Sequence, residues 1–195
     1  MEVSERFYTA ERSEWRAWLA AHYKTAADVW FVFPTLASGE PSLSYNDAVE
    51  EALCFGWIDS TAKKWDDTHQ LRHFTPRRKG SGYSRPNIER LLWLDARGML
   101  LPEVRESVLP LLREPFVYPA DILAAIEGDP AVRERFAAFP APYKRIRVAY
   151  IDAARGRPAE FEKRLANFLA QTAKGKLIAG YGGIEKYYGI PEESI

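Results

Sequence analysis

The pattern of apolar and polar residues in the first half of the chain predicts an amphipathic helix. Apolar side chains recur at intervals of three and four from Tyr45 to Phe55, which places them on one face of an α-helix. Ser44 stands before this run as a candidate N-cap, and Gly56 follows it, where a helix would end. The segment is therefore expected to pack one face against the rest of the protein.

The residues after this helix alternate with the period of a β-strand. In the run 57–63, one face of a strand would carry an aromatic ring, a carboxylate, a hydroxyl and an ammonium group, from Trp57, Asp59, Thr61 and Lys63. A turn at Asp66 and Asp67 leads into a second alternating run at 70–75, which Pro76 ends because proline has no N–H to donate. The pattern predicts a β-hairpin.

Two further elements precede the hairpin. Residues 11–23 carry Trp15 and Trp18 at helical spacing and predict a helix, and the apolar run at 27–34 predicts a buried strand. With the hairpin, this strand completes a small three-stranded antiparallel sheet in the N-terminal half. The fold class expected from these elements is α+β and mainly helical.

After Gly98 the pattern changes to short helices separated by prolines. Helices are predicted at 102–112, 119–127 and 130–139, then around the apolar residues at 143–151 and 161–172. Prolines at 110, 115, 119, 130, 140, 142 and 158 favour a compact C-terminal helical array over long coiled coils.

These patterns suggest three parts that pack as one compact unit. Residues 1–100 form an α+β part with the hairpin and a basic loop, and residues 101–178 form the helical part. The tail 179–195 is rich in glycine and aromatic residues, and we expect it to be mobile or to dock weakly.

Composition limits the classes of function. The chain has 195 residues, 47% of them hydrophobic, and a formal net charge of zero, so no whole-molecule field recruits nucleic acid or an anionic membrane. Cys54 is its only cysteine, which leaves no disulfide framework. The sequence has no signal-peptide pattern and no apolar run near the ~20 residues of a membrane span, so we expect a cytoplasmic protein without membrane insertion.

The segment between His69 and Arg90 concentrates positive charge. It holds six basic residues and one acidic residue, next to glycines and the start of a helix at Ser84. Guanidinium groups and backbone N–H groups at a helix start are suited to holding a small anion. The predicted ligand site consists of Trp57, Asp59, Lys63, Arg72, Phe74, Arg77, Arg78, Ser81, Ser84 and Asn87.

Within that site, Arg72, Arg77 and Arg78 would hold the anion, Ser84 would cap it, and Trp57 or Tyr83 would cover an apolar portion. The alternative is a solvated loop whose arginines pair with acidic residues such as Asp59, Asp66 and Asp67.

Catalysis, metal binding and binding of a nucleic-acid strand are weaker interpretations of this part of the chain. Asp59, Lys63 and His73 form the one plausible acid–base set, but no nucleophile elbow, P-loop or dinucleotide motif accompanies them. His69 and His73 would lie ~13 Å apart on an extended strand, too far to chelate one metal ion. We therefore expect a binding protein with no metal, no cofactor and no nucleic-acid partner.

Three phrases of the sequence resemble a known family. Residues 51–59 (EALCFGWID), 74–78 (FTPRR) and 81–87 (SGYSRPN) closely resemble the YdeI/OmpD-associated family, also labelled bacteriocin-protection proteins, and the likeness extends from about the first helix to about Lys176. The resemblance implies an association with envelope porins and with tolerance of bacteriocins or cationic peptides. It brings no reaction, cofactor or catalytic residue.

The sequence thus predicts a cytoplasmic, non-enzymatic binding protein linked to envelope stress, with an anion site at the basic loop. One alternative is an enzyme acting on a phosphorylated or carboxylated small molecule. Another is a scaffold that docks an envelope-related protein partner through its helical half. The sequence carries no signal for an oligomeric state.

Overall fold

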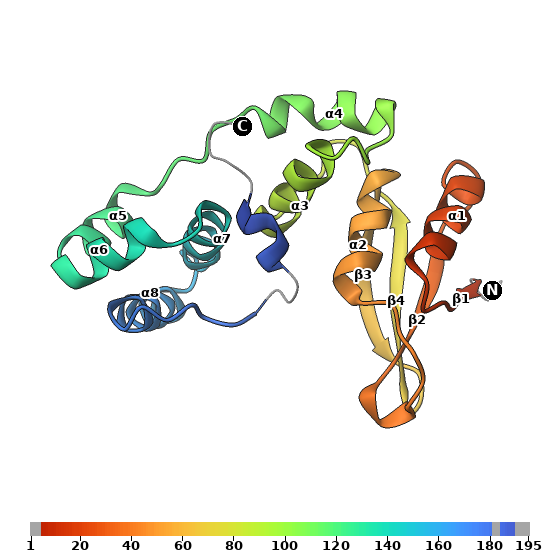
Figure 1. The fold of residues 1–195 in the computed structure, drawn as a ribbon, viewed down its shortest axis with the longest axis horizontal. Helices are drawn as coiled ribbons and strands as arrows, with labels where there is room; N and C mark the ends of the chain where they lie inside the picture. The colour runs from red at the N-terminus through yellow and green to blue at the C-terminus, as the bar shows by residue number, and fades with distance from the viewer. Residues whose placement is uncertain (1–4, 181–183, 190–195) are drawn as a thin grey trace. The chain divides into compact units, whose positions relative to one another are not determined.

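The computed structural model describes residues 5–180 and 184–189. The chain divides into two compact units, each described here by itself (Figure 1). The first comprises Met1–Gly82 and Leu94–Leu109, and the second comprises Tyr83–Trp93 and Pro110–Ile195.

The first unit contains a mixed sheet of four strands among the described residues, in the order β1-β2-β4-β3. The strands are β1 (Arg6–Phe7), β2 (Val29–Pro34), β3 (Trp57–Lys64) and β4 (His69–Pro76). The antiparallel pairings of β2 with β4 and of β4 with β3 agree with the sequence pattern. The prediction of three antiparallel strands is nevertheless wrong, because β1 adds a parallel edge strand whose two residues are too few to show alternation.

Helices α1 (Arg12–His22) and α2 (Tyr45–Cys54) lie side by side over the sheet (Figure 1), and the short 3₁₀ helix η1 (Leu36–Ser38) follows β2. Trp15 of α1 is fully buried, with its ring 5.0 Å from Phe31 and 5.4 Å from Phe74 between centroids. Its indole Nε1 donates a hydrogen bond to the carbonyl of Ala48 at 3.0 Å, so the polar end of the side chain is also satisfied.

The predicted boundaries of α2 are confirmed. The Ser44 hydroxyl oxygen accepts a hydrogen bond from the Asp47 backbone N–H at 3.0 Å, which satisfies one of the free donors of the first turn. Gly56 follows the helix with φ of +71°, a backbone conformation that glycine adopts without strain.

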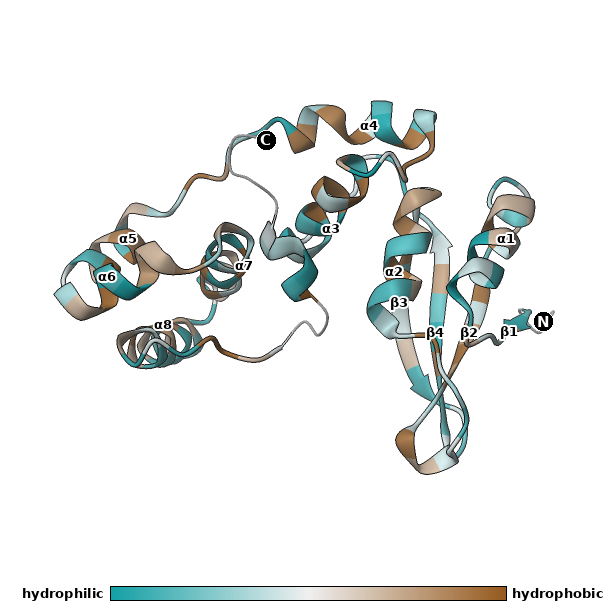
Figure 2. Ribbon diagram, in the orientation of Figure 1, coloured by the Kyte–Doolittle hydropathy of each residue, from teal (hydrophilic) through white to brown (hydrophobic). Residues whose placement is uncertain are grey.

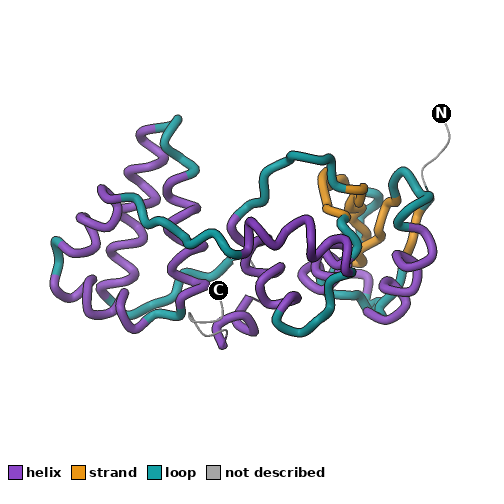
Figure 3. The backbone as a smooth tube through the Cα atoms, turned by 90° about the horizontal axis from the view of Figure 1, so that it is seen from above, coloured by secondary structure: helices purple, strands orange, loops and turns teal. Residues whose placement is uncertain are grey.

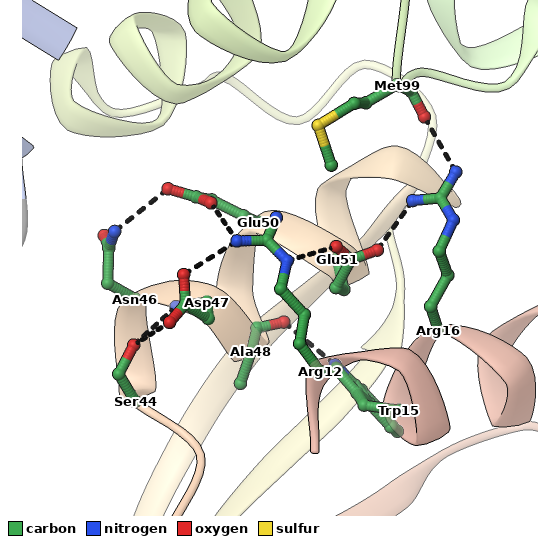
Figure 4. Close-up of polar contacts among 10 residues, drawn as sticks. All are labelled: Arg12, Trp15, Arg16, Ser44, Asn46, Asp47, Ala48, Glu50, Glu51 and Met99. Carbon is green, nitrogen blue, oxygen red and sulfur yellow. Dashed lines mark hydrogen bonds and ion pairs between the residues drawn. The ribbon is translucent and has the colours of Figure 1, made fainter. Parts of the chain in front are cut away.

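Ion pairs join α1 to α2 (Figure 4). The Arg12 guanidinium reaches three carboxylates, with Nη1 2.7 Å from Asp47 and 2.9 Å from Glu50, and Nε 2.5 Å from Glu51. Arg16 binds the other oxygen of Glu51 at 2.6 Å and donates to the Met99 carbonyl at 3.1 Å. Because Glu51 is 1% exposed, its charge depends on these two arginines.

Helices joined by loops make up the described part of the second unit (Figure 3). They are α5 (Ala120–Glu127), α6 (Pro130–Ala138), α7 (Ala141–Asp152), α8 (Pro158–Ala173) and the 3₁₀ helix η2 (Ile184–Gly189), with the parts of α3 (Arg85–Asp95) and α4 (Pro102–Leu112) that fall in this unit. Apolar residues of α5 to α8 form one core. Hydrophobic and hydrophilic residues alternate along α4, as expected for an amphipathic helix (Figure 2).

The helical array predicted from the sequence is confirmed, with helix ends within three residues of the expected positions. One proline differs from its predicted role, because Pro110 lies inside α4 instead of separating two elements.

The tail expected to be mobile or weakly docked is partly described. Residues 181–183 and 190–195 lie outside the described residues. Within η2, Ile184 and Tyr187 are buried, and the Tyr187 ring lies 5.7 Å from Trp93 of the same unit. Two side chains of this part of the tail therefore pack into the interior, while Glu185 and Lys186 are exposed.

Across the described residues, each helix is either too short or too polar to cross a membrane.

Candidate functional site

A β-bulge separates the polar residues that the sequence placed on one face of β3. Asp59 pairs with Phe74, but the next pairing joins Ala62 to Arg72, so one extra residue lies in β3 between them. Asp59 accepts a hydrogen bond from the Tyr45 hydroxyl of α2 at 2.7 Å. The Lys63 ammonium instead covers the Trp30 ring at 4.1 Å. Trp30 pairs with His73, whose side chain lies on the opposite face of the sheet from Phe74. Lys63 and Asp59 therefore lie on opposite faces of β3, and the prediction that they share one face is wrong.

The two aromatic residues predicted to line the site lie in the core of the first unit. Trp57 and Phe74 are 1% and 0% exposed. The Trp57 indole N–H donates to the Tyr23 carbonyl at 3.1 Å, as a core tryptophan does. Arg72 lies 3.8 Å from the Asp59 carboxylate and 4.8 Å from the Tyr45 ring, so its charge faces residues of its own unit.

The basic loop folds on itself. Arg77 Nη2 donates to the carbonyls of Ser81 and Gly82 at 3.0 and 2.5 Å, and the Ser81 hydroxyl donates to the Arg78 carbonyl at 2.7 Å. The Arg78 and Lys79 side chains are exposed. In this loop the Arg77 guanidinium therefore stabilises a turn.

Ser84 and Asn87 belong to the second unit, at the start of α3. The Ser84 carbonyl accepts the N–H groups of Asn87 and Ile88, both at 3.0 Å, which begins the helix where the sequence predicted. The Asn87 side-chain oxygen accepts a hydrogen bond from Arg90 at 2.9 Å. The ten predicted residues thus fall on both units, with Trp57 and Phe74 in the core of the first unit and Ser84 and Asn87 at the start of α3 in the second.

The hairpin turn between β3 and β4 contains a pH-sensitive pair. His69 Nδ1 lies 3.0 Å from the Asp66 carboxylate, and Asp66 also accepts the Thr68 N–H at 2.7 Å. The Thr68 hydrogen bond, followed by the contact with His69, lowers the Asp66 pKa to about 2. The Asp66 hydrogen bond raises the pKa of His69 above its usual 6.5.

We expect the turn to be most stable between about pH 4 and 6.5. The stability that the protonated His69 gives the turn is complete below the pKa that His69 has in the unfolded chain. This stability is lost as the pH rises through the higher pKa that His69 has in the folded protein. The Asp66 contribution is present above its unfolded pKa and is lost only as the pH falls toward about 2. An NMR titration should give a raised His69 pKa that falls in Asp66→Asn, although Glu40, 3.2 Å from His69 Nε2, still acts to raise it. Asp67→Asn is the matched control, because Asp67 contacts Lys64. A His69 pKa that is the same in Asp66→Asn as in the wild type would contradict this assignment.

The second unit contains a hollow of about 350 Å³ beside the start of α3. One charged side chain from the basic segment, Arg85, faces it together with Tyr83. The remaining lining is mostly apolar: Ile88, Leu111, Pro115, Phe116, Val117 and Ala149, with Glu114 as the acidic member. Sequence reasoning proposed Tyr83 as one of two possible aromatic covers of the ligand, but it counted Arg85 only in the basic segment and left it out of the predicted site.

Arg85, the basic residue in the lining of this hollow, belongs to a buried ion cluster. The Glu89 carboxylate is fully buried and receives Arg85 Nε at 2.6 Å and Nη2 at 2.5 Å. Arg145 of α7 binds the same carboxylate with Nε and Nη2, each at 2.7 Å, in a bidentate geometry. The Arg85 and Arg145 side chains are 10% and 8% exposed, so two guanidinium groups share one carboxylate inside the protein.

The electrostatic balance of this cluster favours a further anion. Burial lowers the pKa of Arg85, and the neighbouring charge of Arg145 acts in the same direction, against the opposing effect of Glu89. The Arg85 guanidinium also lies 4.9 Å from the Phe116 ring, and this cation–π contact stabilises its charge only weakly. A ligand carboxylate at Arg85 would add negative charge where the cluster has more cation than anion.

Local sequence patterns predict only part of this cluster. The i,i+4 spacing of Arg85 and Glu89 predicts their ion pair. Arg145 lies 56 residues from Glu89, and no spacing rule connects them. The available clue is the run Lys144, Arg145 and Arg147 in an otherwise apolar helix, since an arginine on a buried helix face needs a carboxylate partner. Among the residues that the structure describes, no three His, Cys, Asp or Glu side chains gather as metal ligands.

The fold and the site define an α+β unit joined to a helical unit that carries a buried arginine cluster. Residues 7–107 match the family described as a domain of unknown function (DUF8412), and because this match covers half of the chain, the protein belongs to that family. Residues 115–175 match the family described as bacteriocin-protection, YdeI or OmpD-associated. No curated protein and no solved structure matches the chain.

The second match confirms the predicted family for the helical segment. The phrases that carried the resemblance lie at 51–87, inside the region that the first family covers, so the two family models divide the chain.

Proposed function

We propose that the protein is a non-enzymatic, cytoplasmic binding protein that acts in tolerance of bacteriocins or cationic peptides and holds a small organic anion beside Arg85. The ligand class is a single carboxylate on a compact apolar body. The association with tolerance rests on the YdeI/OmpD-associated match of residues 115–175. The binding activity rests on the hollow in the second unit.

The observation that carries the proposal is the sharing of the Glu89 carboxylate by two guanidinium groups next to an apolar hollow. A hollow of about 350 Å³ is large enough for a small organic ligand. Its apolar wall would pack against the apolar part of the ligand, and the Arg85 guanidinium would bind the ligand's carboxylate. Arg78 and Lys79 of the basic loop are exposed to solvent, which screens their charges, so this hollow is the better anion site.

Isothermal titration calorimetry with benzoate tests the proposal. Benzoate should bind the wild-type protein and bind Ala149→Leu at least tenfold more weakly. Ala149 lines the hollow from α7, and a leucine there would occupy space that the ring needs while leaving Arg85, Glu89 and Arg145 in the sequence. In this variant the benzoate ring would lose its contact with the apolar wall, and its carboxylate would lose the charge-assisted hydrogen bond from Arg85. Together these losses account for a change of this order.

Two variants serve as controls. Ala138→Leu makes the same change at an exposed helical position that does not line the hollow, and it should bind benzoate like the wild type. The double variant Arg78→Ala with Lys79→Ala removes two charges from the basic loop and should also leave binding unchanged. Loss of binding in this double variant, with unchanged binding in Ala149→Leu, would move the site to the basic loop and overturn the assignment to Arg85.

A further inference from the structure

The second unit has another cavity, of about 320 Å³, against α7 and α8. Its lining residues carry three positive formal charges and one negative charge, on Arg147, Lys163, Arg164 and Glu160. Apolar and aromatic side chains complete the wall: Tyr150, Ile151, Phe168 and Ile178. The lining therefore combines an excess of two positive charges with a surface that can cover a ring or an alkyl group.

Backbone carbonyls hold both arginines of this cavity in place. Arg147 Nη2 donates to the carbonyls of Ile178 and Ala179 at 2.6 and 3.0 Å. Arg164 Nη1 donates to the Tyr150 carbonyl at 2.7 Å, and its guanidinium carbon lies 3.7 Å from the Tyr150 ring centroid. A carbonyl satisfies a hydrogen bond but removes no formal charge, so these contacts orient the cations and leave their charge in place.

Gly180 allows the chain to pass close to Arg147. Its φ is +133°, and a Cβ at this position would lie 3.3 Å from Arg147 Nη2. Glycine at position 180 leaves room for the Arg147 guanidinium to donate to the carbonyls of Ile178 and Ala179, the two residues before Gly180. The acidic residue Glu160 binds Arg164 Nε at 2.7 Å and so offsets one of the three positive charges.

From this arrangement we infer that the cavity between α7 and α8 is a second ligand site, which binds a small phosphate monoester with an apolar or aromatic group. Two positive charges in excess match the dianion of a phosphate monoester better than they match a monocarboxylate. Arg147 and Arg164 would contact the phosphoryl oxygens from fixed positions, and the exposed Lys163 would approach from the rim. This site shares none of its lining residues with the hollow at Arg85.

Calorimetric titration of the full chain with phenyl phosphate at pH 8 tests this inference. Lys163→Ala should weaken binding about threefold to tenfold, because it removes one of the two excess charges from a solvent-screened rim. Glu160→Gln should strengthen binding about threefold, since it removes the one negative charge from the lining. Lys174→Ala deletes an exposed lysine that does not line the cavity and should leave binding unchanged.

The charge of the probe gives an independent measurement. A phosphate monoester loses its second negative charge below about pH 6, so phenyl phosphate should bind more weakly at pH 5 than at pH 8. Benzoate, with the same ring and one charge, should not respond to Lys163→Ala. Absence of phenyl phosphate binding, equal weakening by Lys163→Ala and Lys174→Ala, or an unchanged affinity in Glu160→Gln would each overturn the assignment. Because the benzoate site depends on Ala149 and not on Lys163, either site can fail without the other.

Discussion

Replacement of Glu89 by Gln is expected to lower the free energy of unfolding of the second unit by about 3 to 5 kcal/mol, the usual cost of breaking a buried ion pair. The variant removes the one carboxylate to which the structure joins Arg85 and leaves that guanidinium buried. It also removes the carboxylate that Arg145 binds with two hydrogen bonds. Urea unfolding followed by circular dichroism, with hydrogen exchange of the α3 and α7 amides, would measure the loss.

An exposed ion pair of the same unit provides the control. Asp121 binds Arg155 at 2.7 Å, but both side chains are about half exposed, so Asp121→Asn should change stability only slightly. A loss in Glu89→Gln no larger than that in Asp121→Asn would mean that the buried cluster does not organise α3 and α7.

Glu51→Gln is the second substitution with a large expected effect, a loss of about 2 to 3 kcal/mol from the first unit. Glu51 is buried and receives Arg12 at 2.5 Å and Arg16 at 2.6 Å, which joins α1 to α2 (Figure 4). The expected loss is smaller than for Glu89 because Arg12 and Arg16 are 29% and 38% exposed and can regain water.

Tryptophan fluorescence during urea unfolding would report this change through Trp15 and Trp18, which lie in the core under α1. Glu103→Gln is the matched control in the same unit, since Glu103 is exposed and lies 4.0 Å from Lys24. Equal stability of the two variants would show that the carboxylate of Glu51 is not needed to hold the helices together.

The elements of the fold were largely predictable because their signals are local. Apolar spacing and a capping serine define α2 within a few residues, and alternation bounded by a proline defines β4. Strand β1 gave no such signal, because two residues cannot establish a period and their pairing with Trp30 and Phe31 is a tertiary contact. Pro110 was expected to interrupt a helix but lies within α4.

The candidate site was less predictable because its geometry depends on long-range contacts. The bulge after Asp59 changes which residues share a face of β3, and alternation alone cannot reveal an extra residue in a strand. A count of charges along the basic segment also could not show that Arg77 serves its own loop, or that Arg145 joins Arg85 at Glu89.

The two proposed anion sites differ in the charge of the ligand that they would match. The hollow at Arg85 has one cation and one carboxylate, Glu114, on a mostly apolar wall, and we propose it for a monocarboxylate that contacts Arg85. The cavity at Arg147 and Arg164 has two positive charges in excess and is suited to a dianion. This difference makes the affinities for benzoate and phenyl phosphate separable by single substitutions.

The most direct measurement is the NMR signal of the Arg85 Nε–H group during titration with benzoate. This N–H donates to Glu89 at 2.6 Å, so a carboxylate arriving at the same guanidinium should change its chemical shift. We expect a saturable shift in the wild-type protein and none in Ala149→Leu. A wild-type Arg85 signal that stays in place while benzoate binds elsewhere, or that moves equally in Ala149→Leu, would contradict the proposed site.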